Sequence, residues 1–367
     1  MKLRRLTGLL LSLVLLFCTG CSQSAAPRSA PSPTAEEQAL SSPSETPAEA
    51  PSNQQAEETV SAEKNAPAPA QEASFTLCAY LPVSSMTQGA AAVAEEYAGS
   101  ISALDYLVLN TGAYWGENGA LSLSDELLDA IETLQGKTAL WCTVNPQGAL
   151  IREGTAGQSI DTPQERQVLA QEIAAFAEQY GLAGIDIDWE FPLDDEWEDF
   201  STFLITLKDT LSRNSKPVAL SLALYPEEIA LSEEAIAALD RIHVMAYDQF
   251  DSEGFHSTMQ TAEDAVAYFT ALGASPQQLV LGIPAYGRPL DGSAQWVFYK
   301  DIDPESISGE NPDLVGDISF NSAATAAQKT QYALEQNLGG VMVYQLLCDR
   351  NDQDALILAC ANMAENA

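Results

Sequence analysis

The chain is poor in the residues that most often hold metal ions. Its 367 residues include two histidines and six cysteines. When Cys18 and Cys21 near the N-terminus are set aside, the other four cysteines form no C-x-x-C pair, and neither His243 nor His256 lies at a spacing typical of a zinc site. We therefore expect no metal ion and no cofactor.

The four remaining cysteines fall into two groups. Cys78 and Cys142 lie in apolar segments that we predict as strands, where we expect them to be buried small residues. Cys348 and Cys360 lie close together near the C-terminus, and a disulfide between them stays open if the protein folds in an oxidising compartment.

Basic residues are scarce as well. The 16 lysines and arginines stand against 52 aspartates and glutamates, which gives a formal net charge of -36 at pH 7. A surface this negative repels nucleic acid and anionic lipid, so we expect neither as a partner of the folded part. An uncharged partner suits the charge, but acidity that serves solubility alone explains it equally well.

Apolar runs long enough to cross a bilayer are absent. The N-terminal run at 6–17 falls short of the about 20 residues that a spanning helix needs, and it follows the basic segment 2–5, as in a secretory signal peptide. The sequence CTGC at 18–21 resembles a bacterial lipoprotein processing site. We therefore expect a signal peptide at 1–20 and lipid on Cys21, which would hold a monomer on the outer face of the cell membrane; cleavage without lipid is the alternative.

Large aliphatic and aromatic residues are nearly missing from 22–74. Alanine, proline, serine, glutamate and glutamine dominate this stretch, and such a mixture cannot bury enough apolar surface to fold. We predict a disordered tether over 22–74 and one globular domain over 75–367.

The globular domain carries a repeated pattern of apolar, β-branched-rich runs, each followed by an amphipathic helical stretch. The clearest helix begins at Thr162 with Pro163 and Glu165 in its first turn, a capping-box arrangement, and ends at Gly181. The eight predicted strands lie near 75–81, 104–110, 138–144, 184–190, 217–223, 241–247, 279–285 and 339–345.

Eight alternating pairs predict an α/β fold of the (β/α)8 TIM-barrel type. An open doubly wound sheet is the structural alternative, but no glycine-rich phosphate loop follows the first strand. TIM barrels place their chemistry at the C-terminal ends of the strands. Residues in those positions are therefore the candidates for a site.

The segment AGIDIDWEFP at 183–192 is the most informative one. If it is a strand, Asp186, Asp188 and Glu190 share one face, because side chains alternate along a strand. Neighbouring acids on that face lie about 7 Å apart, so we expect at least one to keep a proton near neutral pH. The alternative is an edge strand with a solvated acidic face, but burying unused carboxylates beside apolar residues is costly.

The same segment resembles the strand-4 signature of family 18 glycoside hydrolases, the chitinase family, whose pattern is D-G-x-D-x-D-x-E. Asp186, Asp188 and Glu190 occupy its last three acidic positions, with Glu190 on the proton donor. Ala183 replaces the first acid, at the start of the strand and away from the chemistry. The resemblance implies a TIM barrel that hydrolyses glycosidic bonds.

Other strand ends extend the resemblance. VMAYD at 244–248 matches the family's M-x-Y-D, so the resemblance gives Tyr247 the role of holding the substrate's acetamido group and includes Asp248 among the substrate-binding residues. GGVMVYQL at 339–346 is similar to strand 8, where Tyr344 replaces the usual tryptophan under the sugar.

The match is uneven elsewhere. Tyr80 falls on a family position facing the same sugar, and 281–288 is similar to strand 7. The S-x-G-G pattern of strand 3 is replaced by LWCTVNP at 140–146, so no role is carried over there. We expect Trp115, in the loop after the second strand, to be a sugar platform, whereas Trp189 alternates away from Glu190 and should pack between barrel and helices.

The resemblance implies a substrate-assisted retaining mechanism. Glu190 would be the acid and base, with its pKa raised by Asp188 and partial burial, and the substrate's 2-acetamido oxygen would attack the anomeric carbon. Asp188 would accept a hydrogen bond from the acetamido N–H and share a proton with Asp186, while Tyr247 would orient the acetamido carbonyl.

The expected substrates are β-1,4-linked N-acetylglucosamine glycans, with chitin or chitooligosaccharides first. Peptidoglycan or the chitobiose core of N-glycans stays open, as does the choice between endo and exo action. A sugar-binding lipoprotein without activity and a scaffold without a ligand are alternatives of a different class. The retained Glu190 argues against a binding protein.

Overall fold

The computed structural model describes residues 75–307 and 311–367. All of them belong to one compact unit, Gln71–Ala367. The predicted signal peptide at 1–20, the lipid site at Cys21 and the tether at 22–74 lie outside the described residues. Within the described ranges, no helix combines the length and apolarity that crossing a membrane requires.

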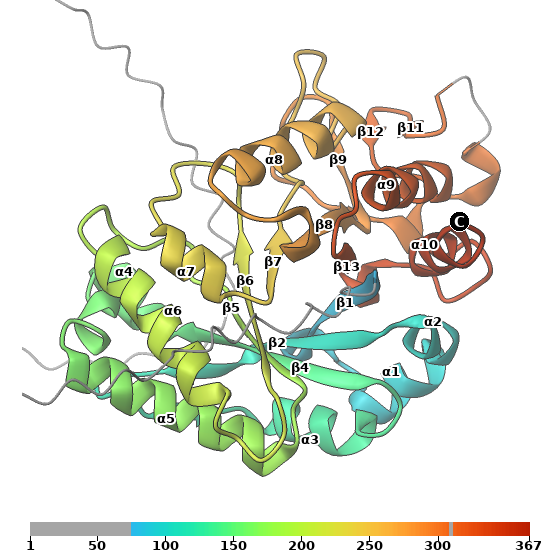
Figure 1. Ribbon diagram of the computed structural model, residues 1–367. Coiled ribbons are helices and arrows are strands. Elements are labelled where there is room, and N and C mark those ends of the chain that lie inside the picture. The colour runs from blue at the N-terminus through green and yellow to red at the C-terminus, as the bar shows by residue number, and fades with distance from the viewer. Residues whose placement is uncertain (1–74, 308–310) are drawn as a thin grey trace, which may run out of the picture. The chain divides into compact units, whose positions relative to one another are not determined.

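Eight parallel strands close into a barrel (Figure 1). Each strand pairs with the next in the order β1-β13-β8-β7-β6-β5-β4-β2, and β1 pairs with β2 to close the ring. The barrel strands are β1 Thr76–Pro82, β2 Tyr106–Trp115, β4 Ala139–Pro146, β5 Gly184–Ile187, β6 Ala219–Leu224, β7 Arg241–Val244, β8 Leu279–Pro284 and β13 Gly340–Tyr344. The predicted (β/α)8 barrel is confirmed, and all eight predicted strand segments contain a strand.

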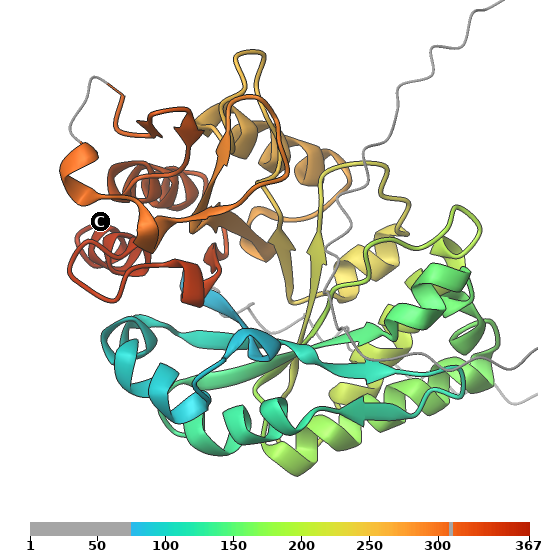
Figure 2. The same ribbon diagram turned by 180° about the vertical axis from the view of Figure 1, so that it is seen from behind.

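Helices surround the barrel, as the opposite views of Figures 1 and 2 show. The described α-helices are α1 Ala90–Glu96, α2 Ala98–Ala103, α3 Asp125–Leu134, α4 Gly148–Glu153, α5 Pro163–Tyr180, α6 Trp197–Leu211, α7 Glu233–Ala238, α8 Met259–Ala271, α9 Ala323–Glu335 and α10 Leu356–Glu365. Short 3-10 turns are η1 Val83–Ser85, η2 Ala156–Ser159, η3 Pro276–Gln278, η4 Tyr299–Asp301, η5 Pro304–Ser306 and η6 Leu346–Cys348.

Helix α5 forms as its sequence predicts. Thr162 accepts a hydrogen bond from the backbone N–H of Glu165, and the Glu165 carboxylate accepts one from the backbone N–H of Thr162. Pro163 fills the first turn, where its missing N–H costs nothing, and Gly181 ends the helix in the left-handed conformation. Local sequence therefore fixes both ends of this helix.

The structure has two apolar cores. The larger one lies between the strands and the surrounding helices and is mostly aliphatic. The smaller one consists of sulfur-containing, aromatic and aliphatic side chains from the barrel strands and the segments that follow them: Cys78, Tyr80, Tyr106, Val108, Trp141, Met245, Tyr247, Val280, Tyr286 and Met342. The hydroxyl of Tyr80 in this core reaches Asp186, the acidic residue of β5.

A second, four-stranded sheet lies between β8 and β13 in the chain, and the sequence did not reveal it. Its order is β10-β9-β12-β11, formed by β9 Tyr286–Pro289, β10 Val297–Phe298, β11 Leu314–Val315 and β12 Ile318–Ser319. Helix α9 lies in the chain between this sheet and β13. A further strand, β3 Leu121–Leu123, pairs antiparallel with the end of β2.

The cysteines are all buried and free in the described part of the chain. Cys78 and Cys142 are buried strand residues, as expected. Cys348 and Cys360 do not pair, so the disulfide that the sequence left open is not formed.

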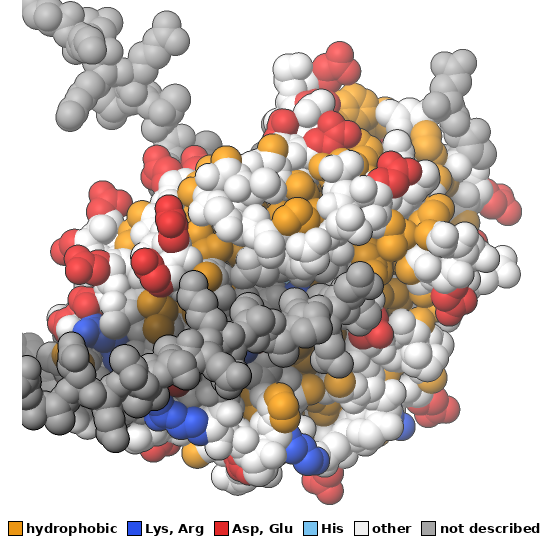
Figure 3. All heavy atoms as spheres, viewed as in Figure 1, with side chains coloured by type: hydrophobic (Ala, Val, Ile, Leu, Met, Phe, Trp, Pro, Cys, Tyr) orange, Lys and Arg blue, Asp and Glu red, His pale blue; other side chains and the backbone are white. Residues whose placement is uncertain are grey.

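Acidic side chains are spread over the face drawn in Figure 3, while basic ones appear at few points. This distribution matches the large excess of aspartate and glutamate in the sequence.

Candidate active site

The acidic segment 183–192 enters the barrel as a strand and leaves it as an irregular turn. Strand β5 ends at Ile187, so Asp188 and Glu190 lie in the segment after it and not in the strand, contrary to the prediction for 184–190. Asp186 is fully buried, Asp188 is half-buried and Glu190 is exposed. The three acids therefore lie at successive depths between the barrel interior and its C-terminal mouth, where TIM barrels carry their sites.

Gly184 at the start of β5 allows a close approach that no other residue would. A Cβ atom there would lie 2.1 Å from Cδ2 of Trp141 on the neighbouring strand β4. The Trp141 ring also stacks on Tyr106, with ring centroids 4.2 Å apart. The glycine of the motif thus lets an aromatic layer form beneath the acids.

Asp186 is held by hydroxyl groups from three other strands of the barrel. Tyr80 on β1 donates to its Oδ2 over 2.9 Å, and Thr143 on β4 donates to the same atom over 3.0 Å. Ser221 on β6 donates to Oδ1 in a short hydrogen bond. Thr143 and Ser221 lie directly beside Asp186 in the strand register.

His243 on β7 completes this buried network. Its Nδ1 lies 2.6 Å from the Tyr80 hydroxyl and 3.2 Å from Asp186 Oδ1, and its Nε2 lies 2.9 Å from the Tyr106 hydroxyl. Every contact is satisfied if Tyr106 donates to Nε2 and Nδ1–H donates toward Tyr80 and Asp186. No local sequence pattern marks His243, Thr143 or Ser221, because their partner is on another strand.

Asp188 and Glu190 form the upper pair. Burial raises the pKa of Asp188 well above its ordinary value, and the charges of Glu190 and Asp186 raise it further. Although part of the Glu190 side chain is exposed, loss of solvent around its carboxyl raises its pKa; a hydrogen bond from Asp188 opposes this, and the charge of Asp248 adds to it. The pKa of Glu190 is therefore raised, as expected, and burial is the main cause.

Glu190 and Asp186 both act on Asp188, and the neighbouring Glu190 carboxyl raises its pKa more than Asp186 does. Asp186 itself accepts hydrogen bonds from three hydroxyl groups. The backbone N–H of Asp188 donates to Asn145 Oδ1 over 3.1 Å. Its buried Oδ1 atom has no hydrogen-bond partner among residues 75–307 and 311–367.

Tyrosines form a wall beside the acids. Tyr247, which follows β7, and Tyr344, the last residue of β13, stack with ring centroids 5.5 Å apart. Tyr247 is buried and Tyr344 half-buried. Gly282 on β8 makes room for Tyr247, because a Cβ atom there would lie 2.8 Å from the Tyr247 ring. Both tyrosines thus lie at the barrel mouth, where the resemblance placed them.

Asp248 is fixed by three residues, two on β9 and one in the loop after β7. Its carboxylate accepts a hydrogen bond from the Tyr286 hydroxyl over 2.8 Å and pairs with Arg288, and its backbone N–H donates to His256 Nε2 over 2.9 Å. Asp248 also has a positive φ of 56°, a conformation that aspartate tolerates better than most residues. This carboxylate is therefore neutralised and held in place.

Trp296 is an aromatic residue of the site that the sequence analysis missed. It lies between β9 and β10, stacks on Tyr286 with centroids 3.8 Å apart and an interplanar angle of 4°, and meets Tyr344 edge-on at 6.3 Å. The second sheet therefore supplies part of the aromatic wall. No spacing in the sequence indicates this, since the tryptophan comes from an irregular loop.

Two predicted substrate contacts are not available in this structure. Trp115 is the last residue of β2 and fully buried; its indole N–H donates to Ser159 and its ring packs edge-on against Trp189. It is a core residue and not a sugar platform. Tyr80 is 2% exposed, with its hydroxyl on Asp186, so it supports the acids from below. Trp189 is buried between barrel and helices, as expected, with its ring edge-on against Phe200 of α6.

Metal ligands are not grouped in the described part of the chain, where no three histidine, cysteine, aspartate or glutamate side chains are placed to hold an ion. The site consists of a carboxyl pair with raised pKa values, Asp188 and Glu190, two fixed carboxylates, Asp186 and Asp248, and an aromatic wall. Such a set can protonate a leaving group and bind a flat apolar ring face.

Solved structures with the same fold include a chitinase from Bacteroides thetaiotaomicron, with a TM-score of 0.66, 21% identity, and coverage of 79% of this chain and 96% of that one. A chitinase mutant from Cycas revoluta in complex with (GlcNAc)4 has a TM-score of 0.61, 20% identity, and coverage of 78% and 99%. At this level of identity the likeness shows the fold alone.

Sequence relatives point the same way. Chitinase 1 of Aphanocladium album is 24% identical over 245 residues, which are 52% of this chain and 58% of that protein, so the chain spans little more than half of this relative's length. The model of the glycosyl hydrolases family 18 matches residues 154–349, which include all three acids, Tyr247 and Tyr344. The chain therefore belongs to the glycosyl hydrolases family 18.

Proposed function

We propose that this protein hydrolyses β-1,4 linkages in N-acetylglucosamine-containing glycans, with chitin or chitooligosaccharides as first choice. One observation carries the proposal: a carboxylate pair with raised pKa values, Asp188 and Glu190, lies at the barrel mouth beside an aromatic wall. Family membership and the chitinase relatives support the same substrate class.

Glu190 is the proposed acid and base. It is the most exposed of the three acids, so it can reach a glycosidic oxygen, and its raised pKa keeps a proton available closer to neutral pH. The same residue would later take a proton from the attacking water, as retaining mechanisms require.

The nucleophile is the substrate's own acetamido oxygen in this proposal. A second carboxylate across the bond is the usual alternative, and Asp248 is a candidate because its charge acts on Glu190. Arg288 and Tyr286 already bind the Asp248 carboxylate, which makes it a poor nucleophile. The unpartnered Oδ1 of Asp188 can instead accept a hydrogen bond from an acetamido N–H.

Tyr247 is the proposed donor to the acetamido carbonyl, and its burial beside Tyr344 keeps water from competing for that bond. Asp186 would act below, since its charge helps Asp188 keep the proton. Together these roles predict retention of configuration and a requirement for an N-acetyl group at the cleaved position.

The test is reducing-end release from chitooligosaccharides by the wild type, Glu190→Gln and the matched control Glu198→Gln, an exposed residue on α6. We expect Glu190→Gln to lower kcat by about 10²–10⁴-fold, the usual contribution of general acid–base catalysis, and the control to leave it unchanged. Equal cleavage of deacetylated and acetylated oligomers would refute substrate assistance. Binding without turnover by the wild type would indicate a sugar-binding protein.

The natural glycan and the location are further parts of the proposal. Peptidoglycan and N-glycans belong in the same assay, since both contain N-acetylglucosamine, and the products from oligomers of defined length separate endo from exo action. We propose that lipid on Cys21 holds the protein on the outer face of the cell membrane. Cys21→Ala should then release it into the medium, whereas retention of that variant in the membrane fraction would argue against the anchor.

A further inference from the structure

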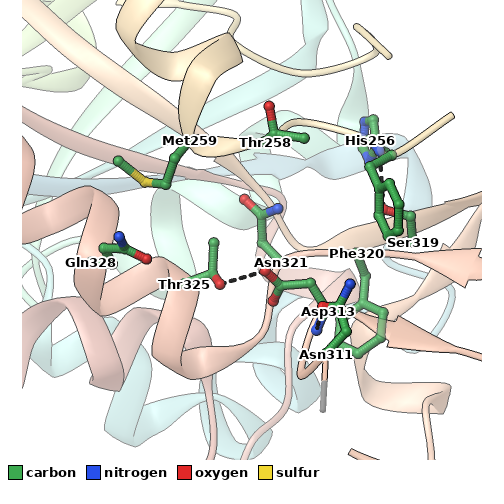
Figure 4. A pocket seen from close by; sticks show the side chains of 11 residues that line it. His256, Thr258, Met259, Asn311, Asp313, Ser319, Phe320, Asn321, Thr325 and Gln328 are labelled. Atoms are coloured by element: carbon green, nitrogen blue, oxygen red, sulfur yellow. Dashed lines mark hydrogen bonds between the residues drawn. The ribbon is translucent and has the colours of Figure 1, made fainter. Parts of the chain in front are cut away.

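A cavity lies apart from the acids of the barrel mouth, behind the loop that carries Asp248. Its volume is about 220 Å³, and it is lined by the loop after β7, the start of α8, the end of the second sheet and helix α9 (Figure 4). This volume is far larger than the roughly 30 Å³ that one water molecule occupies in the liquid. A single ordered water would leave most of it unfilled.

Two buried polar atoms in the cavity lining lack partners. His256 is 1% exposed and Asn321 is 2% exposed, yet His256 Nδ1 and Asn321 Oδ1 have no hydrogen-bond partner among the residues that the structure describes. Unpaired buried polar atoms are costly, and native structures rarely keep them without a reason. Both residues line the cavity, and Figure 4 shows their side chains beside it.

The hydrogen-bonding character of both atoms is defined. His256 Nε2 accepts the backbone N–H of Asp248, so the neutral ring must carry its proton on Nδ1, which is a donor. Burial lowers the pKa of His256 to about 3, with help from the charges of Lys329 and Arg288, so the ring is neutral in ordinary conditions. Asn321 Nδ2 donates to Ser257 O over 3.0 Å, which identifies Oδ1 as the free acceptor.

One donor and one acceptor match a hydroxyl group, which is both. The remaining lining adds apolar surface from Phe255, Met259 and Phe320. The charges disfavour ions: Asp313 at the rim repels anions, whereas buried Lys329, which donates to Ser257 behind the lining, disfavours cations. Hydroxyls beside apolar ring faces are the chemistry of a sugar.

We infer that this cavity binds a single neutral sugar or a similar polyol, as a site separate from the catalytic one. One hydroxyl of the bound molecule accepts from His256 Nδ1–H, and another donates to Asn321 Oδ1. His256 also accepts the backbone N–H of Asp248. A molecule in the cavity would therefore contact a residue that holds the loop after β7 in place. This inference does not depend on the proposed hydrolysis.

Methionine methyl groups allow a direct test in the full chain. Met259 lines the cavity, whereas Met245 and Met342 belong to the aromatic core of the barrel. We would titrate protein labelled with ¹³C at the methionine methyls with N-acetylglucosamine, glucose and glycerol. The expected result is a saturable shift of the Met259 signal with at least one of the three.

Two variants of helix α9 control the experiment. Gln328 lines the cavity and is exposed, so the larger side chain of Gln328→Trp should fill the entrance. The affinity measured from the Met259 shift should then fall at least tenfold, while the acids of the barrel mouth are unchanged. Gln331→Trp places the same side chain on the same helix outside the lining and should change nothing. A Met259 signal that stays still, or shifts only of Met245 and Met342, would overturn the inference. A response unaffected by Gln328→Trp would overturn it as well.

Discussion

The hydroxyl donors around Asp186 should be worth more than ordinary side-chain hydrogen bonds. Thr143→Val keeps the shape and the β-branching of the side chain but removes the hydroxyl that donates to Asp186 Oδ2 over 3.0 Å. A hydrogen bond to a charged group contributes about 1.5–3 kcal/mol, against about 0.5–1.5 kcal/mol for a neutral pair. Asp186 is fully buried, so no solvent can replace the lost donor.

We therefore expect Thr143→Val to lower the free energy of unfolding by about 2 kcal/mol, and Ser221→Ala to lower it by a similar amount. The combined variant should differ from the sum of the two, because both hydroxyls share the carboxylate as partner. Activity should fall as well, since Asp186 supports the proton on Asp188.

Urea unfolding monitored by tryptophan fluorescence measures these free energies. The matched control is Thr202→Val on α6, whose hydroxyl donates to a backbone carbonyl at the exposed surface; we expect a change within about 0.5 kcal/mol there. If Thr143→Val cost no more than this control, the hydroxyl would not stabilise Asp186. The account of the buried network would then be wrong.

Other predictions concern stability and packing. Burial lowers the pKa of Lys329 to about 7, so the unfolded chain binds more protons between pH 7 and the ordinary lysine pKa; stability should therefore rise with pH in this window, by at most about 1.4 kcal/mol per pH unit. Urea unfolding at about pH 7 and pH 9 measures this rise in the free energy of unfolding, and Lys329→Met should abolish it. The same rise in Lys329→Met as in the wild type would contradict the lowered pKa of Lys329. Gly184→Ala should lower the free energy of unfolding by about 1–3 kcal/mol, because the added methyl group overpacks against Trp141. A melting temperature equal to that of the wild type would rule out the close contact. Trp115→Phe should lower stability through its lost bond to Ser159 but leave KM for chitooligosaccharides unchanged, whereas a raised KM would restore it as a sugar contact.

The sequence by itself determined what depends on neighbours along the chain. Strand positions follow from short apolar runs, and the ends of α5 follow from Thr162, Glu165 and Gly181, because capping acts within a few residues. The acids of 183–192 were recognisable for the same reason, since their spacing lies within one segment. The repeat of strand and helix then predicted the barrel.

Only the tertiary structure decided which side chains meet. The partners of Asp186 are 106, 43 and 35 positions away in the chain, so no local pattern could assign Tyr80, Thr143 and Ser221 to it. Trp115 was misplaced for the same reason, because burial depends on helices that follow later in the chain. Local sequence sets the elements and their order, whereas the closing of the barrel sets the distances, the burial and the pKa values.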